Sequence, residues 1–414
     1  MKSFLVIPLR NVLRNRRRTA ITLMVIVFGA MALMLAGGFF ANSYEGLRER
    51  TIRNGLGHVQ VVTEPFLKDG EEKPLANGIQ DYRALQARLE QFPHVVGTTG
   101  EVGFVGLISN GEKSEAFMGR GVDPAREKQI GFTTNIKDGQ ALSHTEPTEE
   151  DAEYEALLGM GLASTLKAKV GDILTVMSTT TDGSLNGVDV KVVGLFSTGV
   201  KEFDDRALKV KLRTAQTLVG AERVTRIIIR LDETPNTDAV VEAINTSGLE
   251  AGGIKLRARS WSELATFYHQ VVRMYDAIFL VLGVIIAVLV VLSSSNTMMM
   301  AVLERVQEVG TLMAIGARRW QVLGIFIVEG FLVGSLGAVL GLVMSFLAIK
   351  GINAANILLP PPPTFSTGIP LKINFVPRLC VIVFVLVTLT QTISAFLPSI
   401  KAARLKIVDA LRHI

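Results

Sequence analysis

The sequence predicts an α-helical membrane protein with four transmembrane helices and a large α+β domain between the first helix and the second. Three observations lead to this fold class. Four apolar runs approach or exceed the roughly 20 residues that an α-helix needs to cross a bilayer. Hydrophobic residues make up 49% of the chain, whereas charged residues make up 20%. In the long stretch between the first two runs, strand patterns and helix patterns alternate.

The apolar runs divide the chain into nine segments. In order, we predict a basic interfacial helix at 1–19, a first span at 20–41, a large domain at 42–272, a second span at 273–298, a connecting segment at 299–319, a third span at 320–349, a loop at 350–377, a fourth span at 378–397 and a tail at 398–414. The first run exceeds the usual signal-peptide core of about 7–15 apolar residues and lacks a clear A-x-A cleavage site. We therefore expect it to be a retained membrane anchor.

The distribution of basic residues predicts the topology. Six lysines and arginines precede the first span, three lie in 299–319 and four lie in the tail. Because loops rich in lysine and arginine stay in the cytoplasm, we expect both termini and 299–319 to be cytoplasmic. The domain at 42–272 is then extracytoplasmic. The net charge of +5 is explained by attraction to anionic lipid of the inner leaflet, so we do not expect nucleic acid as a partner.

The large domain contains both helix and strand signals. QDYRALQARLEQF at 80–92 has the period of an amphipathic helix, which should end before Pro93. The stretches VVGTTGEVGFVGLIS and EAFMGRGV predict strands that are punctuated by glycines. A region of this size is large enough to form its own core and two subdomains.

The segment 261–281 connects the large domain to the second span without a glycine or proline. We expect one helix to continue through the membrane interface, with Trp261, Tyr268 and Tyr275 as aromatic anchors. Such a helix is stiff and would transmit movement between its ends. An ordinary helix boundary is the alternative interpretation.

The connecting segment reads AVLERVQEVGTLMAIGARRW at 301–320. Val302, Val306, Val309 and Met313 recur with helical spacing, so we expect them to share one buried face. Glu304, Arg305, Gln307 and Glu308 should share the opposite face, where Arg305 and Glu308 are close enough to pair. This pattern is typical of a short amphipathic helix that contacts a partner, and also of a solvated helix that merely joins two spans.

The third span carries two GxxxG spacings, which predict close contact with neighbouring helices within the bundle or across a dimer. The glycines concerned are Gly330, Gly334, Gly337 and Gly341, and we expect them on one face. Glu329 is an intramembrane carboxylate and therefore a functional candidate. It would act directly, face the lipid headgroups, or pair with Arg318 or Arg319.

The chain lacks the motifs of common catalytic sites. No GxxxxGK[ST] phosphate-binding loop and no G-x-S-x-G elbow occurs. Cys380 is the single cysteine, so neither an intrachain disulfide nor a CxxC metal site can form. The five histidines are scattered, and we predict no metal site. We expect no catalytic residues and no cofactor in this chain; if ATP is used, another subunit hydrolyses it.

Four stretches resemble one known family. They are LRNVLRNRRRTAIT before the first span, VVGLFSTGVKEFDD at 192–205, ERVQEVGTLMAIGARRWQVLGIFIVEG at 304–330 and PSIKAARLKIVDALRHI at the C-terminus. In this order they resemble the permeases of MacB/LolC/LolE/FtsX-type ABC transporters, and the second is more similar to the LolC/LolE branch. The resemblance covers essentially the whole chain.

This resemblance implies a fold and a mechanism. The large domain would have a porter-like α/β part with a β-rich subdomain inserted at roughly 105–215. The chain would couple ATP hydrolysis, with ATP and magnesium bound by a separate ATPase, to release of a lipoprotein or other amphipathic cargo. The residues that would contact the ATPase are Glu304, Arg305, Glu308, Gly310, Leu312, Gly316, Ala317 and Arg318. An apolar cargo cavity between span one of one subunit and span two of another would be lined by Phe39, Phe40, Tyr268, Met274 and Phe279.

The resemblance also implies the partners and the location. We expect two ATPase copies, a second identical or homologous permease, membrane lipid, the cargo and a periplasmic acceptor, in the bacterial inner membrane. Two alternative functions belong to the same family. The chain would be an FtsX-like scaffold that regulates an envelope protein without moving cargo, or a MacB-like exporter of peptides, toxins or drugs that works with an outer-membrane duct. MacB-type chains usually carry a fused N-terminal ATPase, whereas this sequence begins at the membrane.

Overall fold

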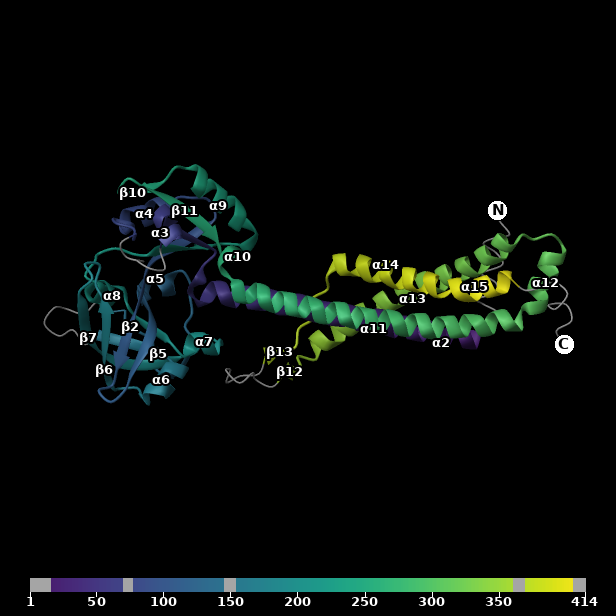
Figure 1. The fold of residues 1–414 in the computed structure, drawn as a ribbon, viewed down its shortest axis with the longest axis horizontal. Coiled ribbons are helices and arrows are strands. Elements are labelled where there is room, and N and C mark those ends of the chain that lie inside the picture. Colours follow the sequence, from purple (N-terminus) through teal and green to yellow (C-terminus); the bar gives the residue numbers. More distant parts are fainter. Residues whose placement is uncertain (1–15, 70–76, 145–153, 360–368, 405–414) are drawn as a thin grey trace. The chain divides into compact units, whose positions relative to one another are not determined.

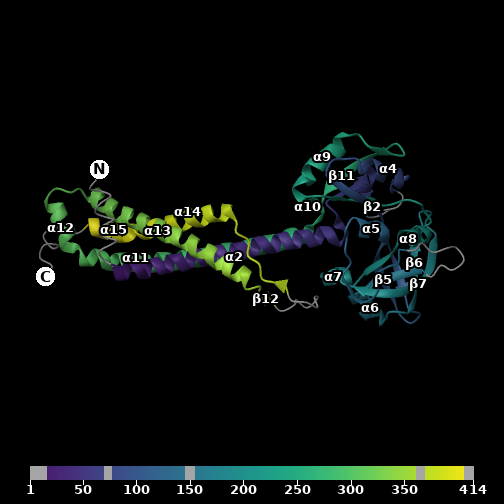
Figure 2. The same cartoon turned by 180° about the vertical axis from the view of Figure 1, so that it is seen from behind.

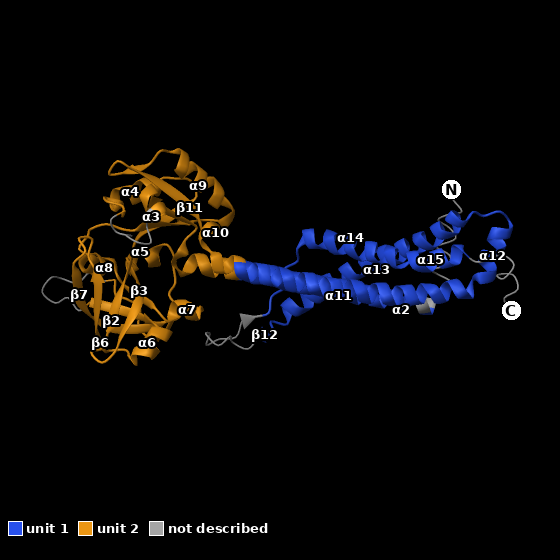
Figure 3. Cartoon of the chain, viewed as in Figure 1, with its two compact units in different colours: residues 1–46, 270–414 blue, residues 47–269 orange. Residues whose placement is uncertain are grey.

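A computed structural model describes residues 16–69, 77–144, 154–359 and 369–404 of the chain. Two compact units are present (Figure 3). The first, which we call the membrane unit, consists of residues 1–46 and 270–414; the second, the sheet unit, consists of residues 47–269. Most of the predicted helix at 1–19 and of the tail at 398–414 lies outside the described residues.

Four helical stretches of the described chain are long and apolar enough to cross a bilayer. They are α2 (Arg16–Thr51), α11 (Thr266–Glu304), α13 (Arg319–Ala354) and α14 (Pro377–Ser394) continued by α15 (Phe396–Ala403). With the α/β sheet unit between the first two, they confirm the predicted fold class. Both α2 and α11 extend beyond the apolar runs at 20–41 and 273–298, because the helical pattern of the sequence continues into polar residues there.

All four helical stretches contribute to the core of the membrane unit. Ile26 and Leu33 of α2 pack with Val290 of α11, Val333 of α13 and Val383 of α14. The outward faces are also apolar: Leu280, Leu292, Leu347, Val381 and Leu389 are each more than half exposed. Exposed apolar surface of this extent is unfavourable in water and favourable in lipid.

The four glycines of α13 lie within about 60° of one another around this continuous helix, so the prediction that they share one face is confirmed. A Cβ atom at Gly330 or Gly334 would lie 2.7 or 2.8 Å from Ala395 or Gln391, at the end of α14. One at Gly337 or Gly341 would lie 2.6 Å from Ile26 or Ala30 of α2. The step of seven residues between the two pairs rotates the helix by only about 20° but advances it by about 10 Å, so the two pairs meet different helices at different levels of α13. Each pair thus admits a different neighbouring helix.

The sheet unit is built on one 11-stranded sheet with the order β10-β11-β1-β9-β2-β3-β8-β5-β7-β4, in which β6 pairs with both β2 and β7. The strands are β1 (Val59–Thr63), β2 (Val95–Ser109), β3 (Ser114–Val122), β4 (Ile136–Gly139), β5 (Tyr154–Gly159), β6 (Ile173–Thr179), β7 (Leu185–Phe196), β8 (Ala207–Lys211), β9 (Arg226–Leu231), β10 (Glu250–Ala251) and β11 (Ile254–Ser260).

Six of these strands form a closed circuit, β2-β3-β8-β5-β7-β6-β2. Closure removes free strand edges, and the interior is filled by side chains such as Phe104, Phe117 and Val176. The circuit uses residues between Glu101 and Lys211. The resemblance placed the β-rich insertion at roughly 105–215, which is close to this range.

The remaining strands form an open part covered by helices. β9 and β11 flank β1, and the first half of β2 pairs with β9. The predicted helix at 80–92 is α4 (Tyr82–Leu89), whose buried leucines join the core together with α9 (Thr237–Thr246). Figure 1 shows α4 and α9 beside β10 and β11, and α6 (Met160–Leu166) beside β5 and β6.

Shorter elements connect these strands and the two units. In the sheet unit they are η1 (Ile52–Leu56), α3 (Glu64–Asp69), α5 (Pro124–Gln129), α7 (Lys201–Asp204), α8 (Leu212–Val219), η2 (Thr234–Asn236) and α10 (Trp261–Leu264); in the membrane unit, β12 (Leu358–Leu359) pairs with β13 (Ile369–Pro370).

The segment before the second span is interrupted, contrary to the prediction of one helix from 261. α10 ends at Leu264, Ala265 leaves the helical region with φ −86° and ψ 61°, and α11 begins at Thr266. Ser260 caps α10, because its hydroxyl accepts the Glu263 N–H while the Glu263 carboxylate accepts the Ser260 N–H. This capping box favours a separate helical turn at Trp261.

Candidate functional site

The connecting segment between the second and third spans forms a helix, α12 (Val306–Ala314). Figures 1 and 2 show α12 at the end of the membrane unit where α2 begins and α15 ends. The predicted apolar face is buried: Val302, Val306, Val309 and Met313 are each less than a tenth exposed. Val309 and Met313 pack with Val322 and Phe326 of α13 and with Ala402 of α15. This apolar contact holds α12 on the helix bundle.

The surface opposite this apolar face, formed by the last residue of α11 and by α12, is exposed and acidic. Glu304, Gln307 and Glu308 are exposed, as the sequence pattern predicted. The turn that follows carries Gly316 at φ 105°, a left-handed conformation that favours glycine, and then Arg318 caps α13. Of the remaining predicted contact residues, Gly310 is buried, Leu312 and Ala317 are half-buried, and Gly316 and Arg318 are exposed.

Arg305 is not on the exposed face, so its predicted position was wrong. It lies at the break between α11 and α12, and its guanidinium Nη1 is 3.4 Å from Oε2 of Glu329 on α13. The Arg305 side chain is 5% exposed and the Glu329 side chain 10% exposed. The predicted partners of Glu329, Arg318 and Arg319, are both exposed. On a helical wheel Arg305 lies beside Val302 and Val309, three and four residues away, so it flanks the buried face and is not opposite it.

Sequence reasoning also missed two apolar side chains beside the acidic face. Ile315 is 81% exposed and Leu303 is more than half exposed. Periodicity did not reveal them, because a single isoleucine after the last regular turn fits a buried position equally well. Exposed apolar groups next to carboxylates are typical of a protein–protein contact surface.

The predicted cargo-cavity residues divide between the two units. In the membrane unit, the Phe40 ring stacks on Tyr275 with 5.1 Å between centroids and meets Phe279 edge-on at 6.3 Å. Phe39 lies 6.0 Å from Phe40, and Met274 is exposed. In the sheet unit, Tyr268 packs edge-on against Trp261 at 5.1 Å. Within one chain, α2 and α11 therefore present an aromatic cluster.

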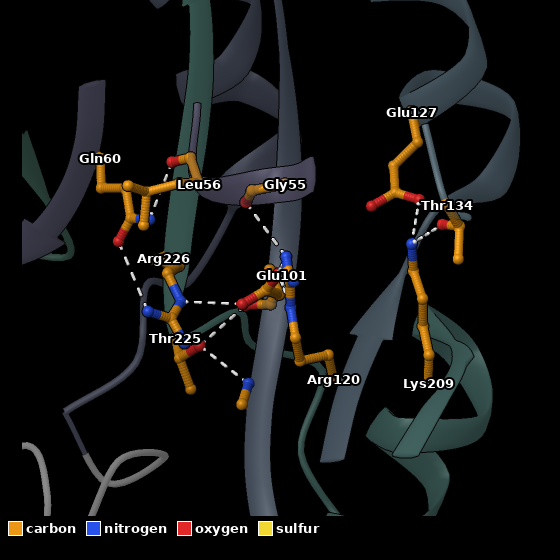
Figure 4. A network of polar contacts seen from close by, with 11 residues as sticks. Gly55, Leu56, Gln60, Glu101, Arg120, Glu127, Thr134, Lys209, Thr225 and Arg226 are labelled. Atoms are coloured by element: carbon orange, nitrogen blue, oxygen red, sulfur yellow. Dashed lines mark hydrogen bonds and ion pairs between the residues drawn. The ribbon is translucent and has the colours of Figure 1, made fainter. Parts of the chain in front are cut away.

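The sheet unit buries a carboxylate between two guanidiniums, an arrangement that sequence reasoning did not find (Figure 4). The Glu101 side chain is 3% exposed; its Oε2 accepts from Nε of Arg120 at 2.7 Å, and its Oε1 lies 2.9 Å from Nε of Arg226. Burial by itself would raise the pKa of Glu101, but the two cations outweigh it and lower that pKa. Arg120 also donates to the Gly55 carbonyl at 3.0 Å, which ties η1 to the sheet.

Two further polar groups of the sheet unit are buried. Lys209 donates from Nζ to Glu127 and to Thr134, each at 2.8 Å, as Figure 4 shows. His58 accepts the Leu231 N–H at Nδ1 at 3.1 Å, which assigns the proton of the neutral ring to Nε2, facing Thr234. Burial lowers the pKa of His58 to about 4. These contacts hold strands and loops of the sheet unit together.

Two protein families match the chain. The MacB-like periplasmic core domain matches residues 19–247, and the FtsX-like permease C-terminal domain matches residues 278–407. The chain belongs to the MacB/FtsX/LolC family of ABC transporter permeases. With its four apolar helical stretches, the permease is a multi-pass membrane protein.

Named relatives of the permease include transporters of different cargo. It is 23% identical to the lipoprotein-releasing system transmembrane protein LolE of Haemophilus influenzae, over 96% of both chains. It is 25% identical to the corresponding LolC protein of Xylella fastidiosa, over 78% of both chains. It is also 24% identical to the macrolide export ATP-binding/permease protein MacB of Escherichia coli, over 96% of this chain and 58% of that one.

Proposed function

We propose that the permease couples ATP hydrolysis, carried out by a separate ATPase subunit, to the release of a lipoprotein or other amphipathic cargo from the inner membrane. The observation that carries this proposal is α12. It is anchored to the bundle by one apolar face and presents an acidic face with exposed Ile315. Similarity to LolE over 96% of both chains supports lipoprotein release within this class.

The acidic face of α12 would dock the ATPase. Glu304 and Glu308 supply negative charge on adjacent turns, and Ile315 supplies an apolar anchor at the exposed turn. A buried apolar side chain surrounded by charge-complementary contacts is the usual composition of a strong protein interface. The complementary ATPase surface would be a basic-rimmed apolar cleft.

The proposed assembly contains two permease subunits, identical or homologous, and two ATPase subunits that bind ATP and magnesium. The basic residues near the first span, α12 and the tail support an arrangement with both termini in the cytoplasm. The sheet unit would then lie in the periplasm and meet a soluble acceptor. The aromatic cluster of Phe39, Phe40 and Phe279, with Met274, would contact the acyl chains of the cargo.

Charge reversal on α12 tests the coupling. In Glu304→Lys/Glu308→Lys we expect at least a tenfold loss of ATPase affinity and loss of ATP-driven release, since two attractive contacts become repulsive. The assay uses permease and ATPase in liposomes that contain a triacylated lipoprotein, with a soluble acceptor outside. Glu112→Lys, in an exposed turn of the sheet unit, is the matched control. Wild-type release by the double variant would contradict the proposal.

The same liposomes distinguish the family alternatives. Release of the lipoprotein in the presence of ATP supports lipoprotein extraction. ATP hydrolysis without release favours an FtsX-like signalling scaffold or a MacB-like exporter of another cargo. Export of a peptide or macrolide from loaded liposomes then separates these two.

A further inference from the structure

The joint between the second span and α12 is a single residue, Arg305. Its backbone, at φ −109° and ψ 16°, leaves the helical region. Hydrogen bonds nevertheless continue across it, because the Arg305 N–H donates to the Val302 carbonyl at 3.1 Å and the Val309 N–H donates to the Arg305 carbonyl at 2.9 Å. The chain can bend at Arg305 while the backbone groups at the end of α11 and at the start of α12 remain hydrogen-bonded.

The Arg305 side chain reaches into the bundle at this joint. Glu329, its partner, lies ten residues after Arg319, or about 15 Å along α13. Ionised groups this deep in a span are expensive to bury, and a paired arrangement is the usual way in which they persist. The ion pair therefore connects the start of α12 to a defined level of α13.

A small cavity adjoins this ion pair. Its volume is about 40 Å³. Most of its lining surface is apolar, but seven polar residues contribute to it: Thr19, Thr22, Ser294, Thr297, Arg305, Glu329 and Gln391. One water molecule needs about 10–15 Å³ when volume is measured in this way. The cavity can hold about three.

Two side chains of the lining point to water as the occupant. Thr22 is 6% exposed and Gln391 is 2% exposed. Thr22 Oγ1 and Gln391 Oε1 find no hydrogen-bond partner among the residues that the structure describes. The amide nitrogen of Gln391 donates to the Ser294 hydroxyl at 2.5 Å, so the amide oxygen is the atom that lacks a partner among the described residues. Buried acceptors of this kind are normally satisfied by ordered water, and the paired charges leave no net charge to attract an ion.

We propose that the Arg305–Glu329 ion pair, solvated by water in this cavity, is the contact that sets the position of α12 on the membrane unit. The apolar packing of Val309 and Met313 holds α12 against the bundle but is not directional. The ion pair adds a directional contact at the joint. Water lowers the cost of stretching that contact, so α12 has a defined resting position and can still tilt about residue 305.

This inference is tested on the purified permease alone in nanodiscs, so its outcome does not depend on the proposed function. Spin labels are placed at Thr311→Cys on α12 and Leu340→Cys on α13, both exposed, in a Cys380→Ser background. The distance distribution between them is measured by pulsed electron paramagnetic resonance. We expect a narrow distribution for the parent and at least a twofold broader one for Glu329→Gln and Arg305→Met.

Charge exchange separates positioning from general destabilisation. The double variant Arg305→Glu/Glu329→Arg restores opposite charges and should narrow the distribution again, and Arg305→Lys should retain most of the parent width. Lys350→Met, a charge removal at the other end of α13, should leave the width unchanged. A parent-like width in Glu329→Gln and Arg305→Met would overturn the inference.

The role of water is tested by two substitutions that remove uncharged polar groups from the cavity lining. Thr22→Val keeps the shape of the side chain, and Gln391→Met keeps most of its volume. If water solvates the ion pair, each substitution should make tilting of α12 cost more energy. The distance distribution between the two spin labels at 37 °C should then be narrower than that of the parent, on the order of 1.5-fold. A width equal to that of the parent in both variants would overturn the role of water. These variants remain folded enough to test even if Glu329→Gln does not, because they keep the ion pair.

The consequence for ATP coupling rests on the proposed function. In the complex with the ATPase, Glu329→Gln should bind the ATPase but lower cargo release per ATP by at least fivefold. Failure of every variant and of the parent to bind an ATPase would contradict the proposed function, while the distance measurements would still decide the positioning role of the ion pair.

Discussion

The two units of the permease bury a carboxylate in different ways. In the sheet unit, Glu101 lies between Arg120 and Arg226. The side chains of both arginines are about one-third exposed, so their charges are partly solvated by bulk water. In the membrane unit, Glu329 has the buried Arg305 as its partner and adjoins a small cavity to which seven polar residues contribute. The difference shows that the desolvation of a buried carboxylate can be offset in two ways. Its cationic partners can remain partly hydrated, or polar groups in a neighbouring cavity can take the place of bulk water.

The largest effect that we expect concerns pH. Since burial lowers the pKa of His58 to about 4, the neutral ring stabilises the sheet unit fully above the unfolded pKa of about 6.5. This contribution is lost as pH falls from about 6.5 to about 4, in total about 3 kcal/mol. In a Trp320→Phe background, fluorescence of the remaining Trp261 reports unfolding of the sheet unit.

The control for the pH prediction is His58→Asn, whose side-chain oxygen can accept the Leu231 N–H. It should be less stable at pH 7 and should show a flatter dependence between pH 6.5 and 4. The helices of the membrane unit, followed by circular dichroism, should persist at a pH where Trp261 fluorescence already reports unfolding. An equal pH dependence in His58→Asn would contradict the assignment.

Removing the buried carboxylate of the sheet unit should have the next largest effect. Glu101→Gln leaves Arg120 and Arg226 facing each other without an anion. Loss of one partner of a fully buried pair costs about 3–5 kcal/mol. Because both arginines reach solvent, we expect about 2–3 kcal/mol, measured by denaturant unfolding with Trp261 fluorescence. Glu112→Gln in an exposed turn should change stability by less than about 0.5 kcal/mol, and an equal loss in both variants would contradict the role of the triad.

Overpacking at a glycine of α13 tests the close helix packing of the membrane unit with a substitution that changes no charge. Gly330→Val places atoms against Ala395, to which even a Cβ would be only 2.7 Å distant. We expect a loss of about 2 kcal/mol, or a shift in the fourth span. Gly351→Ala is the matched control, since nothing lies within 4 Å of its Cβ position and alanine favours a helix. Thermal unfolding in detergent measures both; equal melting temperatures would show that the contact is loose.

An exposed ion pair should have the smallest effect. Lys201 lies 2.7 Å from Asp205 four residues later, but its side chain is almost fully solvated. Lys201→Ala should cost about 0.3–0.5 kcal/mol, and less at high salt because solvent ions screen the pair. A loss comparable to that of Glu101→Gln would remove the distinction between exposed and buried pairs on which the comparison depends.

Much of the candidate site could be predicted because it depends on local patterns. The valines and Met313 of the connecting segment follow the helical period, so their burial and the exposure of Glu304 and Glu308 are visible in the sequence. The pairing of Arg305 with Glu329 could not be predicted in the same way, since the helical period places Arg305 beside Val302 and Val309 but does not say which residue of another helix it meets. The exposure of Ile315 depends on which neighbouring elements pack against the turn, and periodicity contains no such information.

The sequence by itself determined the four spans, the mixed domain between the first two and the amphipathic character of α12, because bilayer thickness and helical period act on consecutive residues. Only the tertiary structure decided which distant groups meet. Glu101 and Arg226 are brought together by strand register, and the glycines of α13 meet the end of α14 at one level of the helix and α2 at another. The Arg305–Glu329 pair forms for the same reason: a contact between elements depends on their packing, whereas the elements themselves depend on their own residues.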